Sequence, residues 1–456
     1  MVSSTYAQKF ENIPQTDIKQ QFIDFQNDVT KIAPTTGMEV YCVKNPANDI
    51  FQLKAIYKVG THTLPQLEMA AEAMNLAFPA ESDLEAFKAA IAATGATYSL
   101  SGDESYTYIE VTGFDDKFDE TLALISSLLA TPALDQSKID LLYESAKTER
   151  KMERSEPGNV AAALLEYIKY GDQSGYIDRP SLKEIKSYKA DKLVEAFKSI
   201  EDYGISIHYS GNLKPEAVAA ACEQAFKTTA QKHVETPVVK ELNQYRGNTV
   251  YFVNKKKATQ STIYFFANGF QYHPEHQAVM DAFNLYFGGD FSGLVLQEIR
   301  ESRSMAYSAG AKYVEPGLEG RESYFIGMIG TQADKTVQAI TIFDSLARHM
   351  PAKPERINMI RQYLTNSSLS KRPHFRNLST QIAAWQNKGF KSDPAYVNQP
   401  VWEDLKFEDI QQFYTRNIAG KPMVICIVGD KKRIDTRELE KFGKVSYIKE
   451  KALFKQ

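Results

Sequence analysis

The hydrophobic residues of this chain recur with two spacings, and together these predict short strands separated by long helices. Residues 38–44 (MEVYCVK) and 248–254 (NTVYFVN) alternate apolar and polar side chains, which is typical of a half-buried strand. In residues 118–132 (FDETLALISSLLATP) the apolar positions fall close to one face of a helix. Strands gathered between long helices indicate an α+β protein, in which helices cover one face of a sheet.

The same pattern occurs twice along the chain. The predicted helix PQLEMAAEAMNLAF at 65–78 returns as PEHQAVMDAFNLYF at 274–287, which is 209 positions later. Two predicted closing strands, ISIHYSG and VICIVGD, carry Gly211 and Gly429 at an offset of 218. The offset therefore changes once, by nine residues, and otherwise holds, as expected for two copies of one fold.

Each copy is expected to be a domain of about 200 residues, within the usual range for a domain. We predict an N-terminal extension at 1–34, a first domain at 35–227 and a second domain at 245–456. The polar segment 228–244 interrupts the pattern and is the predicted linker. In both copies a second strand is expected to end at a glycine, Gly60 or Gly269.

Composition narrows the class of protein. The 456 residues are 43% hydrophobic and 24% charged, as in soluble globular proteins, and the net charge is −3. Scattered basic residues give no footprint for nucleic acid or an anionic membrane. We expect no transmembrane segment, because no run reaches roughly 18 apolar residues. The first residues lack the apolar core of a signal peptide, and periplasm and cytoplasm both remain open as compartments.

Neither cysteines nor histidines form a recognisable metal or disulfide pattern. Cys42, Cys222 and Cys426 lack CxxC spacing, so we expect buried free thiols. None of the seven histidines has HxxEH spacing, and the pair in HPEH, at 273–276, flanks a proline at a predicted turn.

One stretch of the second half carries a specific resemblance. The segment FGGDFSGLVLQEIRESRSMAYSAGAKY, at 287–313, is similar to a signature of the insulinase-like (M16) zinc metallopeptidases, and the similarity extends to GTQADK at 330–335 and to residues 428–443. The chain most resembles the non-catalytic second half of long bacterial M16 proteins, or the inactive subunit of paired ones. The resemblance implies two homologous domains paired like a clamshell, each with a mainly antiparallel sheet and helices on one face, of the LuxS/metallohydrolase-like type.

The zinc motif of the active relatives is degenerate here. Their HxxEH helix holds zinc through two histidines and activates water through the glutamate, with a further glutamate as third protein ligand. By resemblance, the histidine positions fall on Met69 and Ala73, the base on Glu72 and the third ligand on Glu149. Two carboxylates without nitrogen donors make a poor zinc site, so we expect no metal or other cofactor in this chain.

The resemblance also assigns two residues of the second half. Arg300 and Tyr307 match an arginine and a tyrosine that, in active relatives, reach the catalytic zinc from the opposite half of the clamshell. There the arginine orients the substrate backbone, and the tyrosine hydroxyl donates a hydrogen bond to the developing oxyanion.

We therefore predict a non-catalytic M16 subunit that pairs with an HxxEH-bearing zinc peptidase, either a separate chain or a fused first half. Zinc is expected on that partner, polypeptides are the expected substrates, and a homodimer is possible. Two alternatives remain open at this point: a structural or assembly protein without proteolysis, and an active metallopeptidase with a rebuilt site.

Overall fold

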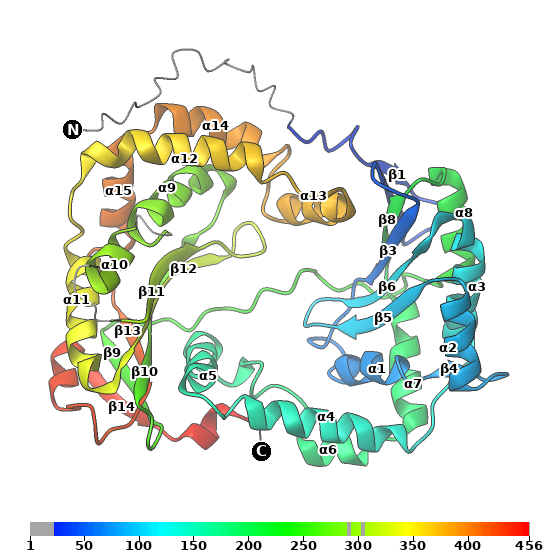
Figure 1. Cartoon of the computed structure of the whole chain (residues 1–456), viewed down its shortest axis with the longest axis horizontal. Helices are drawn as coiled ribbons and strands as arrows, with labels where there is room; N and C mark the ends of the chain where they lie inside the picture. The colour runs from blue at the N-terminus through cyan, green and yellow to red at the C-terminus, as the bar shows by residue number, and fades with distance from the viewer. Residues whose placement is uncertain (1–21, 290–292, 302–305, 456) are drawn as a thin grey trace, which may run out of the picture.

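Two six-stranded sheets lie on opposite sides of the molecule, with helices around them (Figure 1). The computed structural model describes residues 22–289, 293–301 and 306–455, and of Arg300 and Glu301 only the backbone. Arg300 therefore belongs, as far as its side chain is concerned, to the part of the chain outside the described residues.

The first sheet has the strand order β1-β2-β8-β3-β6-β5, and of its pairings only β2 with β8 is parallel. Its strands alternate buried and half-buried positions, as expected for a sheet with a helix-covered face. These strands are β1 (Thr30–Ile32), β2 (Met38–Lys44), β3 (Ile50–Tyr57), β5 (Thr97–Gly102), β6 (Thr107–Phe114) and β8 (Ile205–Gly211).

The second sheet repeats this order, read as β9-β13-β10-β12-β11, with β14 added beside β9 as β1 is added beside β2. Its parallel pairings are β13 with β9 and β9 with β14. The strands are β9 (Thr249–Asn254), β10 (Gln260–Gln271), β11 (Ser308–Val314), β12 (Glu322–Gln332), β13 (Val424–Gly429) and β14 (Lys444–Ile448). The predicted α+β class with mainly antiparallel sheets is confirmed.

The helices follow the strands in the same sequence in both halves. Those of the first half are α1 (Leu67–Met74), α2 (Leu84–Ala93), α3 (Phe118–Ala130), α4 (Lys138–Met152), α5 (Pro157–Tyr170), α6 (Leu182–Ser187), α7 (Ala190–Lys198) and α8 (Pro215–Ala225). A short ladder joins β4 (Phe78–Pro79) to β7 (Pro132–Ala133). The second half has α9 (Gln277–Phe287), α10 (Leu294–Leu296), α11 (Thr336–Arg348), α12 (Ile357–Ser370), α13 (Leu378–Asn387), α14 (Pro394–Asp404) and α15 (Phe407–Asn417).

The strand ends at two glycines differ from the prediction. β3 stops at Tyr57, before Gly60, whereas β10 continues past Gly269 to Gln271, and Gly269 lies within a bulge between Asn268 and Gln271. A Cβ on Gly60 would lie 2.3 Å from the carbonyl oxygen of Asp103, and one on Gly269 would lie 2.4 Å from that of Ser323. Both glycines therefore mark a close backbone approach rather than the end of a strand.

Each sheet is also covered on its second face by a helix from the other half of the sequence. α5 packs on β10 and β13, and its residues Val160, Leu164 and Ile168 share one buried cluster with Cys426 and Phe266. These α5 positions are four apart and form one apolar stripe. Because β13 is buried on both faces, it reads as a continuous apolar run, VICIVG.

The reciprocal contact is made by α13, which lies against the first sheet near the top of Figure 1. Leu378 and Ile382 of α13 cluster with Val43 of β2 and with Ile23 and Val29 of the segment before β1. The two halves are therefore joined by an exchange of helices, and each joint has a small buried cluster with residues from both halves.

Candidate functional site

The helix that corresponds to the zinc helix of active relatives is α1. Its sequence, LEMAAEAM, consists of strong helix formers. Six of its eight residues are buried in the first core. Met69 is 8% exposed and Ala73 is 1% exposed, and both belong to the first hydrophobic cluster. At the two positions assigned to zinc-binding histidines, the structure therefore has apolar side chains that pack in the core.

The carboxylates of the degenerate motif lie on two helices that pack together. Glu72 is half-buried on α1, and α4, which packs against α1, carries Glu149. Burial raises the pKa of Glu72 to about 7, and the negative charges of Glu68 and Glu149 add to the effect. The ionised form of Glu72 is therefore costly in these surroundings, and no nearby cation opposes the rise in its pKa.

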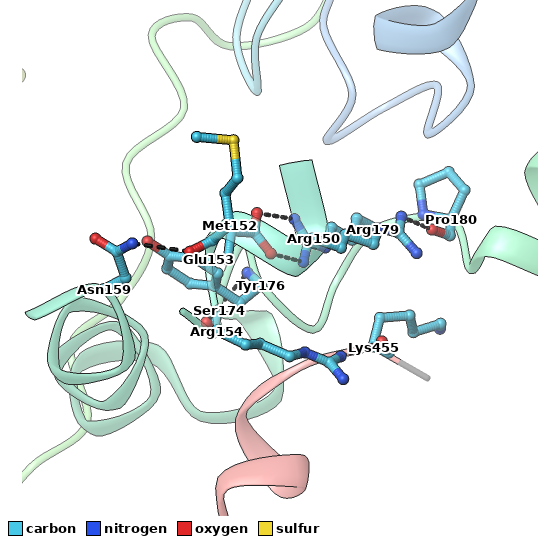
Figure 2. A network of polar contacts seen from close by, with 10 residues as sticks. All are labelled: Arg150, Met152, Glu153, Arg154, Asn159, Ser174, Tyr176, Arg179, Pro180 and Lys455. Carbon is cyan, nitrogen blue, oxygen red and sulfur yellow. Dashed lines mark hydrogen bonds and ion pairs between the residues drawn. The ribbon is translucent and has the colours of Figure 1, made fainter. Parts of the chain in front are cut away.

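Arginines act on one of these acids: Arg150 and Arg179, which Figure 2 shows in a network of polar contacts, lie close enough for their charges to affect Glu68. Arg179 makes a forked ion pair with Glu153, with nitrogen–oxygen distances of 2.7 and 2.6 Å, and buried Arg150 donates to the carbonyl oxygen of Pro180. Burial raises the pKa of Glu68, and the charges of Arg179 and Arg150 oppose that rise. The arginines therefore offset part of the negative charge around Glu68, but not around Glu72.

This set of side chains does not fit a catalytic zinc ion. Tetrahedral catalytic zinc takes about three protein ligands, usually with imidazole among them. Here Glu68, Glu72 and Glu149 offer oxygen only, and the thioether of Met69 is a soft donor within the core. Among the residues that the structure describes, no cluster of three or more His, Cys, Asp or Glu side chains is arranged to hold a metal ion.

Tyr307 immediately precedes β11, and β11 lies on the side of Figure 1 opposite α1. Its backbone N–H donates to the carbonyl oxygen of Gly330 at 2.8 Å, and its hydroxyl accepts a hydrogen bond from Gln332 Nε2 at 3.0 Å. The side chain is exposed and held by the end of β12. The backbone of Arg300 lies in the π-helical turn Gln297–Glu301, which follows α10. Tyr307 is thus open to solvent, at an element distant from the degenerate motif of its own chain.

Sequence reasoning overlooked Glu68, Arg150 and Arg179 as parts of this site. Glu68 is one helical turn before Glu72, so the like-charged i,i+4 pair on α1 was the available signal. The two arginines could not be placed, because Arg179 comes from the loop between α5 and α6 and reaches the site only through tertiary packing.

Residues 205–362 match the family model described as the peptidase M16 inactive domain. This part of the chain is therefore similar to the inactive domain of the M16 peptidases. The resemblance drawn from the sequence is thereby confirmed. A curated relative, an uncharacterized zinc protease of Streptomyces coelicolor, is 21% identical over 229 residues, which are 48% of this chain and 49% of that protein. The match thus spans about half the length of the curated relative.

Solved structures share the fold of this chain at low sequence identity. The peptidase M16 inactive domain of Pseudomonas fluorescens aligns with a TM-score of 0.68 and 16% identity, over 88% of this chain and 98% of that one. The periplasmic protease PqqL of Escherichia coli aligns with a TM-score of 0.69 and 15% identity, over 94% of this chain and 49% of that one. A mutant of the ferredoxin protease FusC, in complex with Arabidopsis ferredoxin, aligns with a TM-score of 0.65 and 11% identity, over 92% and 48%.

These matches show the two-domain clamshell fold. Within the described part of the chain, every helix is too short or too polar to cross a membrane.

Proposed function

We propose that this M16 chain is a non-catalytic half that pairs with an HxxEH-bearing zinc peptidase and helps to enclose a polypeptide substrate. The observation that carries the proposal is the burial of Met69 and Ala73 in the first core, at the positions where a peptidase needs imidazole. Without a bound metal, no water is brought to a pKa near 7, so hydrolysis lacks its nucleophile.

The lengths of the relatives support pairing. This chain aligns with 49% of PqqL and 48% of FusC, so each is about twice as long and has room for a second module. The FusC structure also contains a bound protein, ferredoxin, which supports a polypeptide as the class of ligand. The shared strand order of the two sheets, together with the two sequence offsets, further leads us to infer an internal duplication.

In the proposed assembly, zinc belongs to the partner and this chain supplies contacts from its second half. Tyr307 is exposed at the start of β11, where a partner can reach it, and Arg300 precedes it by seven residues. A tyrosine hydroxyl that donates to the oxyanion lowers the barrier of the partner's reaction.

The test is a hydrolysis assay with an internally quenched peptide and measured zinc content. We expect the pure chain to hold no stoichiometric zinc and to leave the peptide intact. Hydrolysis should appear when the chain is combined with an HxxEH-bearing M16 chain that co-purifies with it from the native source. Chelator-sensitive hydrolysis by the pure chain would overturn the proposal, and an assembly that binds no peptide would favour a structural role.

A further inference from the structure

The second half contains a cavity of about 910 Å³, which is within the size range of ligand sites in proteins. It lies among α9, α12, α13 and α14, at the upper left of Figure 1, with β11 and the segment at Phe22 completing its wall. None of the residues assigned to the M16 site above lines it.

This cavity stands at the second-half counterpart of the degenerate zinc motif. Asp281 of α9 lies 209 positions after Glu72, the same offset that relates the two helices, and Gln277 corresponds in the same way to Glu68. On α12, Ser367 lies 218 positions after Glu149, the second offset of the repeat. Asp281, Gln277 and Ser367 all line the cavity. The fold thus places an acid at the same point of both halves.

Asp281 is held in a setting that lacks a cation partner. One carboxylate oxygen accepts a hydrogen bond from Gln277 Nε2 at 2.8 Å, and within the described residues the carboxylate has no ion pair. Burial raises the pKa of Asp281 to about 7, and Glu315 adds to this, whereas the charges of Lys312 and Lys388 oppose it.

The two lysines whose charges act on Asp281 are engaged by another acid. Lys388 pairs with Glu315 at 3.2 Å, and Lys312 approaches the same carboxylate at 3.9 Å. Arg372 pairs with Asp28 at 3.3 Å, and Lys371, which also lines the cavity, is exposed. Asp281 is therefore left as an acid that a ligand's cation can pair with.

A second polar group lies in the cavity wall. Asn398 of α14 is only 3% exposed and lines the cavity. Its amide can both donate and accept hydrogen bonds, so it can pair with the backbone of a ligand. Aromatic side chains, including Trp385 and Trp402, line the remaining wall, and the Trp402 indole is fixed by donating to the carbonyl oxygen of Ala278 at 3.2 Å.

We propose that this cavity binds a lysine or arginine side chain of the polypeptide ligand. The cationic group pairs with Asp281, the aliphatic stem contacts the aromatic wall, and the ligand's backbone hydrogen-bonds with the Asn398 amide. Aromatic rings favour such a cation as well as its stem. This proposal rests on the proposed function. It adds that the chain prefers polypeptides with basic segments and binds those segments in its second half.

The experiment measures binding of three fluorescein-labelled heptapeptides to the full chain by anisotropy. They differ only at the central position, which is lysine, norleucine or glutamate, and have no other charge. We expect the lysine peptide to bind at least about tenfold more tightly than the norleucine peptide, as for a desolvated charged hydrogen bond. Asp281→Asn, which keeps the acceptor for Gln277, should abolish that preference. Asp404→Asn, an exposed site at the end of α14, is the matched control and should retain it.

The outcomes separate the two proposals. If the wild-type chain binds none of the peptides, the proposed function fails together with this inference. If it binds all three equally, or prefers glutamate, only the cation site fails. A preference that survives in Asp281→Asn also overturns the assignment. If free n-butylamine displaces the lysine peptide when both are at the same concentration, the site binds a small amine. The proposal of a polypeptide ligand is then wrong.

Discussion

His208 of β8 and Ser379 of α13 join the two halves across the exchange of helices: His208 Nδ1 lies 3.0 Å from Ser379 Oγ. The imidazole is buried and stacks on Tyr41, with ring centroids 5.0 Å apart. At the corresponding point of the second sheet, 218 positions later, stands Cys426, which packs under α5 in an apolar cluster. One joint between the halves is therefore apolar, whereas the other contains a titratable group.

The His208 joint is expected to weaken in acid. Burial lowers the pKa of His208 from 6.5 to about 4, and the charge of Lys54 adds to this. The contribution of neutral His208 to the free energy of unfolding is complete above pH 6.5. It is lost as the pH falls, because the unfolded chain then binds a proton that the folded chain does not bind. Between pH 7 and pH 5 the free energy of unfolding should decrease by about 2 kcal/mol through this group.

Urea denaturation at the two pH values measures this change. His208→Gln should remove that part of the pH dependence, whereas His233→Gln, at an exposed position in the predicted linker, should keep it. Equal pH slopes for the wild type and His208→Gln would contradict the prediction.

Restoring the histidines should restore a metal site. Glu72 and Glu149 are still close to each other, so Met69→His combined with Ala73→His completes the donor set of the active relatives. We expect about one zinc ion per chain, detected by elemental analysis. The new side chains enter a packed core, which costs about 1–3 kcal/mol, so the metal-free variant should melt below the wild type and zinc should raise its Tm.

A third change serves as the control for this zinc site. Adding Glu149→Gln to the double variant should remove the stoichiometric zinc, whereas adding Glu144→Gln, an exposed residue on the same helix, should not. Zinc binding that is indifferent to Glu149 would show that α4 does not supply the third ligand.

Tyr307 should matter only in the assembled peptidase. Tyr307→Phe removes the hydroxyl and is expected to lower kcat of the assembly by about 100-fold or more, with little change in KM. Tyr447→Phe, on β14 and similarly exposed, is the matched control. A steady-state assay of the reconstituted complex measures both, and equal activity of the two variants would exclude the oxyanion role.

The helix exchange makes the two halves depend on each other for stability. Leu164→Ala on α5 leaves a cavity against β13 and should cost about 2–5 kcal/mol, whereas Leu141→Ala, which is exposed on α4, should change stability by less than about 0.5 kcal/mol. Hydrogen exchange should report the loss of protection in β10 and β13, far along the chain from residue 164. Faster exchange confined to β2 and β3 would contradict the exchange of helices.

Sequence periodicity predicted several of the elements of this chain. The strands at 38–44 and 205–211 and the helix at 118–130 occur where alternation and helical spacing predicted them, because each pattern depends only on which side chains face one core. The degenerate motif could also be recognised from the sequence, because the loss of two nitrogen donors depends only on which residues stand at fixed spacing. The ends of β3 and β10 were not, because at Gly60 and Gly269 the cause is the approach of another part of the chain.

Tertiary structure alone decided which half each helix covers and what surrounds each acid. The apolar stripe of α5 reads the same whether it packs on its own sheet or on the other one, so the sequence could not show the exchange. Likewise Asp281 is an ordinary residue on a predicted helix. Its raised pKa arises from burial between α9 and its neighbours, and a pKa depends on the surrounding medium and charges rather than on the residue itself.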